Sequence, residues 1–280
     1  MTLNLSGRML DLSEPVVMGI VNATPDSFFA SSRTPEACSA GQRATQMLAE
    51  GAAMLDVGAY STRPGAADVS ADEEMRRLAT VLEAIRREHP DALVSVDTFR
   101  ADIARRCVRD FGVQIVNDIS GGQWDEAMFE TVAELGVPYV MMHVCGTPHT
   151  MHEAVDYDDV AASVAQFFAF RLQQLYDMGV ADVILDPGFG FSKTLEQNYE
   201  LMSRLPDLCR LFQDNAGLVG FSRKSMIYRL LGTSPDEALN GTTVLNTLAL
   251  QAGARILRVH DVRAAVEAIR IRQAVGKLKN

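Results

Sequence analysis

Eight apolar runs recur along the chain, and each ends on a polar residue. The segments between consecutive runs are long enough for one helix each. Uniformly apolar strands are buried on both faces, as in a parallel sheet covered by helices. The runs with their polar ends are Val16–Val21 with Asn22, Met54–Leu55 with Asp56, Leu93–Val96 with Asp97, Gln114–Val116 with Asn117, Tyr139–Met142 with His143, Val183–Leu185 with Asp186, Leu218–Phe221 with Ser222, and Arg255–Leu257 with Arg258 and His260.

The intervening segments have helical periodicity, with apolar residues three and four positions apart. Alternating strands and helices in this number predict an α/β protein with a single (β/α)8 TIM barrel, as one domain over residues 1–280. A doubly wound open sheet is the alternative, but such sheets usually have fewer strands. The periodic positions include Met75, Leu78, Leu82 and Ile85, then Val160, Val164, Phe167, Phe168, Leu172 and Leu175, and later Val262, Val266 and Ile269.

The composition of the chain argues against several classes of function. The 280 residues are 48% hydrophobic with a net charge of −10, which argues against an extended nucleic-acid surface. No apolar run is long enough to cross a bilayer, and the first residues lack the pattern of a signal peptide. Four scattered cysteines, Cys38, Cys107, Cys145 and Cys209, lack metal-binding spacing and favour free thiols. We therefore expect a cytoplasmic enzyme that binds neither nucleic acid nor membrane.

Three hydrogen-bond acceptors end three strands of the predicted barrel. In this fold functional groups lie at the carboxyl ends of the strands, where Asp97, Asn117 and Asp186 fall. Two carboxylates and an amide suit a flat ring with an amidine-like edge, such as a pterin or a purine. One or two of them could instead cap the following helix, but caps alone do not account for all three.

Cationic and aromatic side chains follow other strands. Arg258 and His260 alternate along the last strand, which predicts that they share a face and, with Arg63, form a diphosphate pocket. Asn22 offers an amide oxygen to magnesium, although such an Asn is more often a turn residue. Phe191 follows glycines and could stack on a ring, although Phe is usually a core residue. Further candidates are Thr62 and Pro64, and Lys224 and Ser225 at the start of a helix, next to Arg223, which cannot point the same way as Lys224.

With these motifs assembled, the chain resembles the dihydropteroate synthases, pterin-binding barrel enzymes of bacterial folate synthesis. The resemblance runs from about Val16 to Ile271. The motifs that carry it, in chain order, are Gly19-Ile20-Val21-Asn22-Ala23-Thr24-Pro25-Asp26-Ser27-Phe28, Ser61-Thr62-Arg63-Pro64-Gly65-Ala66, Asn117-Asp118-Ile119-Ser120-Gly121-Gly122, Met142-His143-Val144-Cys145-Gly146-Thr147-Pro148, Asp186-Pro187-Gly188-Phe189-Gly190-Phe191, Ser222-Arg223-Lys224-Ser225 and Arg258-Val259-His260.

The resemblance implies that 4-aminobenzoate attacks the methylene of a dihydropterin methyl diphosphate, giving dihydropteroate and pyrophosphate with Mg2+ assisting. It implies catalytic roles for Asp97, Asp186 and Lys224, a homodimer through the late helices, and sensitivity to sulfonamides. The implied pterin site comprises Asp97, Asn117, Ile119, Met142, Asp186, Gly220 and Lys224. The implied diphosphate site comprises Thr62, Arg63, Arg258 and His260, with Asn22 on the metal, and the implied aminobenzoate site comprises Phe28, Pro64, Phe191, Lys224 and Ser225.

Charge separation in the reaction gives this division a physical reason. Breaking the carbon–oxygen bond makes the leaving group negative and the methylene positive, so we expect cations at one end of the site and carboxylates at the other. The chain departs from the family in two loops: Phe29-Ala30-Ser31-Ser32 stands where Ser-Asp-Gly-Gly is usual, and Ala59-Tyr60 stands where Gly-Glu is usual. The missing loop carboxylate would otherwise stabilise a cationic pterin methylene. We therefore expect its absence to affect turnover and sulfonamide sensitivity.

Two other functions share parts of this pattern. A methyltetrahydrofolate–corrinoid methyltransferase would use the same Asp and Asn acceptors but has no need of a diphosphate clamp at Thr62-Arg63-Pro64 and Arg258-x-His260. A pterin-binding protein without catalysis would fit the altered first loop. Pyrophosphate release that depends on the amine distinguishes the synthase from both.

Overall fold

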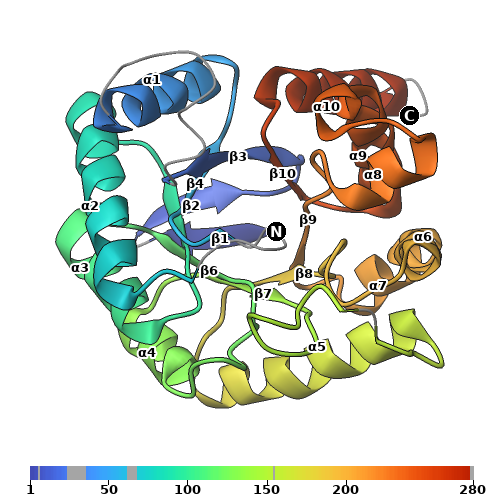
Figure 1. Ribbon diagram of the computed structural model, residues 1–280, viewed down its shortest axis with the longest axis horizontal. Coiled ribbons are helices and arrows are strands. Elements are labelled where there is room, and N and C mark those ends of the chain that lie inside the picture. Colours follow the sequence, from blue (N-terminus) through green and yellow to red (C-terminus); the bar gives the residue numbers. More distant parts are fainter. Residues whose placement is uncertain (6, 24–35, 62–67, 154, 278–280) are drawn as a thin grey trace.

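Eight parallel strands form a closed barrel, as the sequence pattern predicts. The structure is a computed structural model that describes residues 1–5, 7–23, 36–61, 68–153 and 155–277. The last barrel strand pairs with both the first and the seventh, which closes the ring (Figure 1). The barrel strands are β3 (Val16–Asn22), β4 (Met54–Gly58), β5 (Val94–Asp97), β6 (Ile115–Asp118), β7 (Tyr139–Met142), β8 (Val183–Asp186), β9 (Ala216–Val219) and β10 (Ile256–Val259).

Helices surround the barrel and cover the outer face of its strands (Figure 1). The helices are α1 (Glu36–Ala49), α2 (Ala71–Glu88), α3 (Ala101–Phe111), α4 (Met128–Leu135), α5 (Val160–Asp177), α6 (Leu195–Ser203), α7 (Leu205–Leu211), α8 (Ser225–Leu231), α9 (Leu239–Ala252) and α10 (Val262–Lys277), with a short 3-10 helix at Pro235–Glu237. The periodic residues Met75, Leu78, Leu82 and Ile85 are all buried on α2. The predicted alternation of strand and helix is therefore confirmed, with two helices in place of one after β8 and again after β9.

A hairpin at the N-terminus plugs one end of the barrel. Strands β1 (Thr2–Leu5) and β2 (Arg8–Asp11) pair antiparallel, and Leu3 and Leu5 pack with the inward-facing residues of the barrel strands. The sequence analysis did not predict this hairpin, because four-residue strands carry too little periodicity to be recognised. The inner cluster also contains Leu12, Met18, Met54, Leu93, Ile115, Val140, Ile184, Ala216, Leu218 and Ile256.

Two strand ends differ from the predicted ones, and both differences affect the site. Strand β4 continues past Asp56 to Gly58, so the Asp56 side chain lies inside the barrel and is fully buried. Strand β9 ends at Val219, so Phe221 and Ser222 belong to the turn that follows it. A polar residue that interrupts an apolar run therefore does not always mark the end of a strand.

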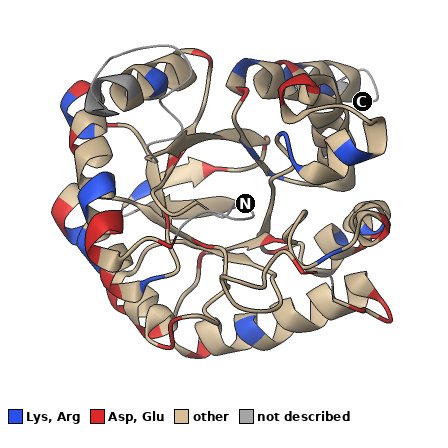
Figure 2. Ribbon diagram, viewed as in Figure 1, with Lys and Arg blue, Asp and Glu red and all other residues tan. Residues whose placement is uncertain are grey.

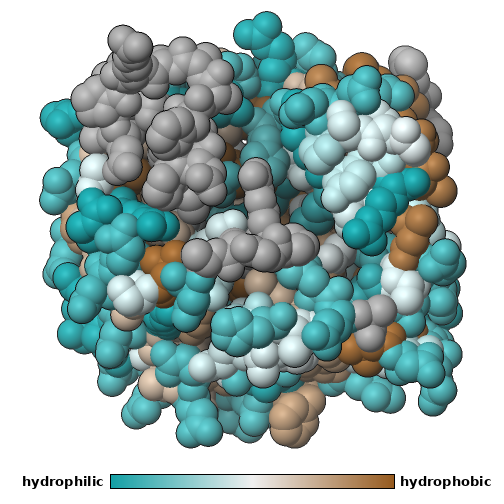
Figure 3. Space-filling model, viewed as in Figure 1, coloured by the Kyte–Doolittle hydropathy of each residue, from teal (hydrophilic) through white to brown (hydrophobic). Residues whose placement is uncertain are grey.

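The outer helices carry acidic and basic residues intermixed (Figure 2). Apolar side chains appear at the edge of the view where Figure 1 places α8, α9 and α10 (Figure 3). In the described part of the chain, no helix is both long enough and apolar enough to span a bilayer.

Candidate active site

An ion-pair network lies inside the carboxyl end of the barrel and is centred on Arg258. Its Nε donates to Asp56 Oδ2 and its Nη2 donates to Asp97 Oδ2, both at 2.6 Å. The amide of Asn117 donates to the same Asp56 oxygen at 2.9 Å. Strands β4, β5, β6 and β10 thus bring two carboxylates, an amide and a guanidinium together, as the pattern of polar strand ends predicts for Asp97 and Asn117.

Burial and charge oppose each other in this network. Burial raises the pKa of Asp97, and the guanidinium of Arg258 opposes that rise. Burial lowers the pKa of Arg258, but Asp56 and Asp97 outweigh it and hold that pKa above its ordinary value. Arg258 is therefore a permanent cation, and Asp56 Oδ1 has no hydrogen-bond partner among the described residues. A buried carboxylate oxygen without a partner requires a hydrogen-bond donor from water or from a ligand.

Asp186 and Lys224 influence each other electrostatically at the same end of the barrel. Asp186 is 6% exposed, and its Oδ1 accepts a hydrogen bond from the Gly188 backbone at 2.8 Å. Burial raises the pKa of Asp186, and Lys224 opposes that rise. Burial lowers the pKa of Lys224 to about 8, with Asp186 opposing the change. Lys224 Nζ also donates to the carbonyl of Phe189 at 2.6 Å, so the loop after β8 holds both partners.

None of the three predicted acceptors caps a helix. The N-cap positions after their strands belong to Arg100, Ala127 and Thr194, and only the last of these makes a side-chain cap. The carboxylates and the amide are therefore available for chemistry inside the barrel, which is the alternative that the sequence analysis favoured.

Apolar residues form one side of the site. Ile119, Met142 and Phe191 belong to a single buried cluster with Phe99, Val144 and Met151, and Tyr60 and Trp124 pack against it. Phe191 is only 7% exposed, with Lys224 Nζ 4.5 Å from its ring centre and His152 stacked 5.5 Å away. These two neighbours hold the Phe191 ring in place.

Gly220 lies close to both Lys224 and Arg258. A Cβ built there would be 3.9 Å from both Lys224 Nζ and Arg258 Cβ. Ser225 begins α8, next to Lys224. The predicted separation of the cations from the carboxylates is wrong for Arg258, because two carboxylates hold its guanidinium. The alternation of residues along β10 could not reveal this contact, which depends on the inward direction of Asp56.

The remaining predicted residues divide into two groups. His260 follows β10, and its Nδ1 lies 2.9 Å from Ser222 Oγ, while Asn22 ends β3 and is half-buried opposite Gly58. The predicted candidates Phe28, Thr62, Arg63 and Pro64, like the altered first loop, lie outside the described residues.

Comparison with known proteins identifies the family. A sequence model described as pterin binding enzyme matches residues 18–260. The chain belongs to the pterin-binding enzyme family. Among curated relatives, the dihydropteroate synthase of Escherichia coli K12 is 43% identical over all of this chain and 98% of its own length. The dihydropteroate synthase of Haemophilus influenzae is 38% identical over 99% of both chains.

Solved structures of dihydropteroate synthases have the same fold as this pterin-binding enzyme. The Xanthomonas albilineans enzyme with 4-aminobenzoic acid has a TM-score of 0.90 and 38% identity over 98% of each chain. The same enzyme with 7,8-dihydropteroate has a TM-score of 0.88 and 35% identity over 99% of each. The Yersinia pestis enzyme in a sulfonamide complex has a TM-score of 0.91 and 39% identity over 99% of this chain and 100% of its own.

One departure from the family motif lies within the described residues of this pterin-binding enzyme. Tyr60, which stands where the family usually has Glu, packs edge-on against Phe99 with ring centres 5.1 Å apart. Arg100 lies over the Tyr60 ring at 5.5 Å, and the phenol donates to Asp68 at 3.0 Å. The substituted residue is thus integrated into the packing of the loop after β4.

The sequence analysis assigned no role to Asp56, His143 or Lys193. Asp56 ends an apolar run as Asp97 does, so the same signal could have identified it. Lys193 Nζ lies 3.1 Å from His143 Nδ1 and also donates to the carbonyls of Gly188 and Phe191. Burial lowers the pKa of Lys193 to about 7 and that of His143 to about 3. This pair supports the loop that follows Asp186. The end of the Tyr139–Met142 run marked His143, but no sequence pattern marked Lys193.

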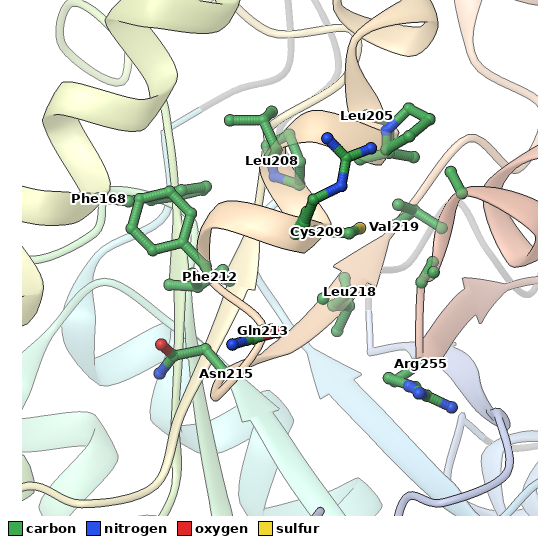
Figure 4. A pocket seen from close by; sticks show the side chains of 18 of the residues that line it. Phe168, Leu205, Leu208, Cys209, Phe212, Gln213, Asn215, Leu218, Val219 and Arg255 are labelled. Atoms are coloured by element: carbon green, nitrogen blue, oxygen red, sulfur yellow. The ribbon is translucent and has the colours of Figure 1, made fainter.

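A cavity of about 410 Å³ lies away from these residues, between α7, β9 and the end of α9 (Figure 4). Leu205, Leu208 and Cys209 line it from α7, and Leu218 and Val219 line it from β9. None of the charged residues described above contributes to it. This cavity is therefore separate from the charged residues at the carboxyl end of the barrel.

Proposed function

We propose that this protein is a dihydropteroate synthase, which condenses 4-aminobenzoate with (7,8-dihydropterin-6-yl)methyl diphosphate to give 7,8-dihydropteroate and pyrophosphate. It is then a transferase of folate biosynthesis. The similar enzyme structures with 4-aminobenzoic acid and with 7,8-dihydropteroate support one substrate and the product. The similar Yersinia pestis enzyme in a sulfonamide complex supports sulfonamide binding by this protein.

The observation that carries this proposal is the convergence of two buried carboxylates (Asp56 and Asp186), the half-buried carboxylate of Asp97, an amide and two cations inside the barrel mouth. Carboxylate oxygens accept the paired N–H groups of an aminopyrimidine edge, and Asp186 has one oxygen beyond the one that Gly188 uses. Asn117 provides both a donor and an acceptor, and Lys224 provides a donor for a ring carbonyl. These carboxylates, the amide and the cations together suit a pterin better than a simple anion, because the carboxylates would repel an anion.

The reaction can proceed by positioning and charge stabilisation. A carbon–nitrogen bond forms as the carbon–oxygen bond breaks, the diphosphate departs with the bonding electrons, and the amine nitrogen releases one proton. Asp56, Asp97 and Asp186 stabilise positive charge on the pterin methylene, while Lys224 and Arg258 limit their mutual repulsion. An aromatic amine needs no activation by a Ser-His-Asp arrangement, so no covalent enzyme intermediate is required.

Our proposal places the aminobenzoate and the diphosphate at the rim. Lys224 contacts the Phe191 ring and begins α8 together with Ser225, so these three residues are suited to an aromatic carboxylate. We propose that Phe28 and Pro64 contact the same aminobenzoate ring. Thr62, Arg63, Arg258 and His260 are proposed to bind the diphosphate. Arg258 would do so while its guanidinium stays paired with Asp56 and Asp97.

Magnesium is proposed as the cofactor. No group of three or more His, Cys, Asp or Glu side chains in the described ranges could hold a metal ion by itself. Mg2+ commonly binds to one or two protein oxygens together with substrate phosphates and water. The half-buried amide of Asn22 at the end of β3 fits that donor set. When bound, the ion would neutralise charge on the departing diphosphate.

We also propose that the protein is a homodimer, with α8, α9 and α10 at the interface. Seven of the thirteen exposed large apolar residues among those described lie on these helices: Leu230, Leu231, Leu239, Val244, Leu248, Ile271 and Val275. A groove with α9 and α10 residues runs across the same surface. A second copy of this chain would bury these side chains. Sedimentation should give twice the mass of 30.6 kDa, and Leu248→Glu should give the monomer.

The cellular site proposed for the enzyme is the cytoplasm. Cys107, Cys145 and Cys209 are free thiols, and Cys107 is fully buried. Thiols persist in a reducing compartment. Fractionation of cells that express the protein should recover the activity with cytoplasmic markers.

The activity assay combines the purified protein with the dihydropterin diphosphate, Mg2+ and 4-aminobenzoate. We expect pyrophosphate and dihydropteroate to form in equal amounts, and only when the amine is present. Asp186→Asn should abolish most turnover, while Asp214→Asn at an exposed position serves as the matched control. Tight pterin binding without release would instead identify a binding protein, and methyl transfer from a folate to a corrinoid would identify a methyltransferase.

A further inference from the structure

The turns after β9 and β10 are joined at two adjacent points. Ser222 meets His260 at the first, with Oγ 3.1 Å from the backbone nitrogen and 2.9 Å from the ring Nδ1. Arg223 meets Asp261 at the second, with Nε and Nη2 donating to the two carboxylate oxygens at 2.8 and 2.9 Å. Two consecutive residues of one turn therefore fix two consecutive residues of the other.

One assignment of the hydrogens at Ser222 places the imidazole hydrogen of His260 on Nε2. A backbone N–H can only donate, so the bond from His260 N uses Ser222 Oγ as an acceptor. The hydroxyl keeps its single hydrogen to donate, and Nδ1 lies within its reach at 2.9 Å. A neutral imidazole that accepts at Nδ1 carries its own hydrogen on Nε2. In this assignment Ser222 selects one of the two neutral tautomers of His260, whereas in the other Ser222 Oγ accepts from both nitrogens and donates elsewhere.

Arg223 adopts a backbone conformation that needs support. Its φ is +57°, in the left-handed region that non-glycine residues rarely adopt. Its backbone nitrogen donates to Thr242 Oγ1 at 3.2 Å, and its guanidinium donates to the carbonyls of Pro235 and Asp236 as well as to Asp261. Burial raises the pKa of Asp261, but Arg223 outweighs this and lowers it, so the pair is ionised. These bonds hold the turn in the shape that brings Ser222 to His260.

Arg223 and Lys224 are thus assigned different tasks although they are neighbours in the sequence. Lys224 points to the carbonyl of Phe189 inside the site, whereas Arg223 points to Asp261 and to the segment before α9. The backbone carbonyl of His260 accepts a further bond from Arg43 on α1 at 2.6 Å. His260 is therefore held at its backbone from both directions and at its ring by Ser222.

We propose that Ser222 and the Arg223–Asp261 pair are positioning residues, which present His260 as an Nε2–H donor to a phosphate oxygen of the leaving diphosphate. The part that concerns the diphosphate rests on the proposed function. A donor fixed before the reaction needs no rearrangement as negative charge develops on the leaving group. Without the Ser222 hydroxyl, Nδ1 loses the donor that favours this tautomer, so the Nε2–H form makes up a smaller share of the protein.

The first test measures the tautomer in the protein without substrate. NMR of isotope-labelled histidine, above the ordinary imidazole pKa of about 6.5, should detect hydrogen on Nε2 of His260. The chain has five histidines, and His260→Gln identifies the signal. Ser222→Ala should give a mixture of tautomers, and Ser222→Thr should restore the single form. Hydrogen on Nδ1 in the unmodified protein would overturn the proposal, whatever reaction the protein catalyses.

The second test measures binding and turnover. Ser222→Ala removes both hydrogen bonds between the hydroxyl and His260 and should raise KM for the diphosphate substrate about three- to tenfold, with the affinity for a pterin lacking the diphosphate unchanged. Asp261→Asn should act in the same direction, and Asp207→Asn, which breaks an exposed ion pair on α7, should not. Equal losses for the two ligands would indicate a general structural role and overturn the positioning role. Absence of turnover in the unmodified protein would count against the proposed function, while the tautomer measurement would still decide this inference.

Discussion

Arg258 donates a hydrogen bond from Nη2 to Asp97 Oδ2 at 2.6 Å, across the interior of the barrel. Their strands, β10 and β5, are separated by β3 and β4 in the sheet order, so the contact spans the barrel mouth. Asp56 on β4 lies fully buried beneath the same guanidinium. One cation thereby offsets the repulsion between two carboxylates in a region of low dielectric constant.

Replacement of Arg258 by Ala should weaken the binding of both a bare pterin and the diphosphate. The change leaves Asp56 and Asp97 buried without their counter-ion, so they take up protons or move apart. We expect the affinity for each ligand to fall about tenfold or more, measured by calorimetry. Arg258→Lys should retain part of the affinity, because one ammonium replaces the charge but cannot reproduce the forked geometry.

The contrary outcome is equally informative. If Arg258→Ala lost affinity only for the diphosphate, the original expectation of two separate halves of the site would stand, and the ion pairs would be dispensable for the pterin. Thermal unfolding of both variants controls for a general loss of structure.

The lowered pKa of Lys224 predicts a loss of pterin affinity at alkaline pH. Burial lowers its pKa to about 8, so its ammonium is present below that pH and is lost as the pH rises through it. Binding that depends on the charge should therefore weaken above about pH 8. Lys224→Arg keeps its charge throughout this range, and its pH profile reports the titration of the ligand alone. A profile that is flat for the unmodified protein from pH 7 to about 9.5 would count against a charged role for Lys224.

The barrel and much of its site follow from periodicity alone. Apolar runs that end in Asp97, Asn117 and Asp186 define strands whose carboxyl ends must meet once the barrel closes, because parallel strands share one direction. Asp56 has the same signature, but its strand continues for two residues, and only the closed barrel reveals that its side chain faces inward.

Contacts between distant turns could not be predicted in this way. The pairing of Arg223 with Asp261 depends on a left-handed residue in one turn, and the contact of Lys193 with His143 depends on how one loop folds over the neighbouring strand. Neither leaves a periodic trace. The adjacency of Arg223 and Lys224 indicated only that one of them is structural, and the structure assigns that role to Arg223.

Asp186→Asn should reduce pterin affinity while preserving the fold. Its amide oxygen can still accept the hydrogen bond from the Gly188 backbone, so the loop keeps its shape. The variant loses the negative charge toward the aminopyrimidine edge, which is worth about 10- to 100-fold in affinity for a charge-assisted pair. Calorimetry with a bare pterin measures the loss. Unchanged affinity would indicate that the pterin does not bind at Asp186 on β8.

Gly188→Ala should destabilise the protein more than an ordinary loop substitution does. A Cβ at this position would lie 1.9 Å from the carbonyl oxygen of His143, and the residue has a φ of +71°. The loop must therefore move, and we expect the free energy of unfolding to fall by about 3 kcal/mol or more. Gly179→Ala is the matched control, because its φ of +84° imposes the same backbone strain with nothing within 4 Å.

The two variants separate strain from collision. Gly179→Ala should cost about 1 to 2 kcal/mol from the left-handed conformation alone, as measured by urea unfolding. Gly188→Ala should also lower pterin affinity, because the Gly188 backbone holds Asp186 Oδ1 and moves with the loop. Equal destabilisation of the two variants, with pterin affinity unchanged in both, would mean that the loop after β8 can shift without disturbing Asp186, and that the close approach to His143 does not position the carboxylate.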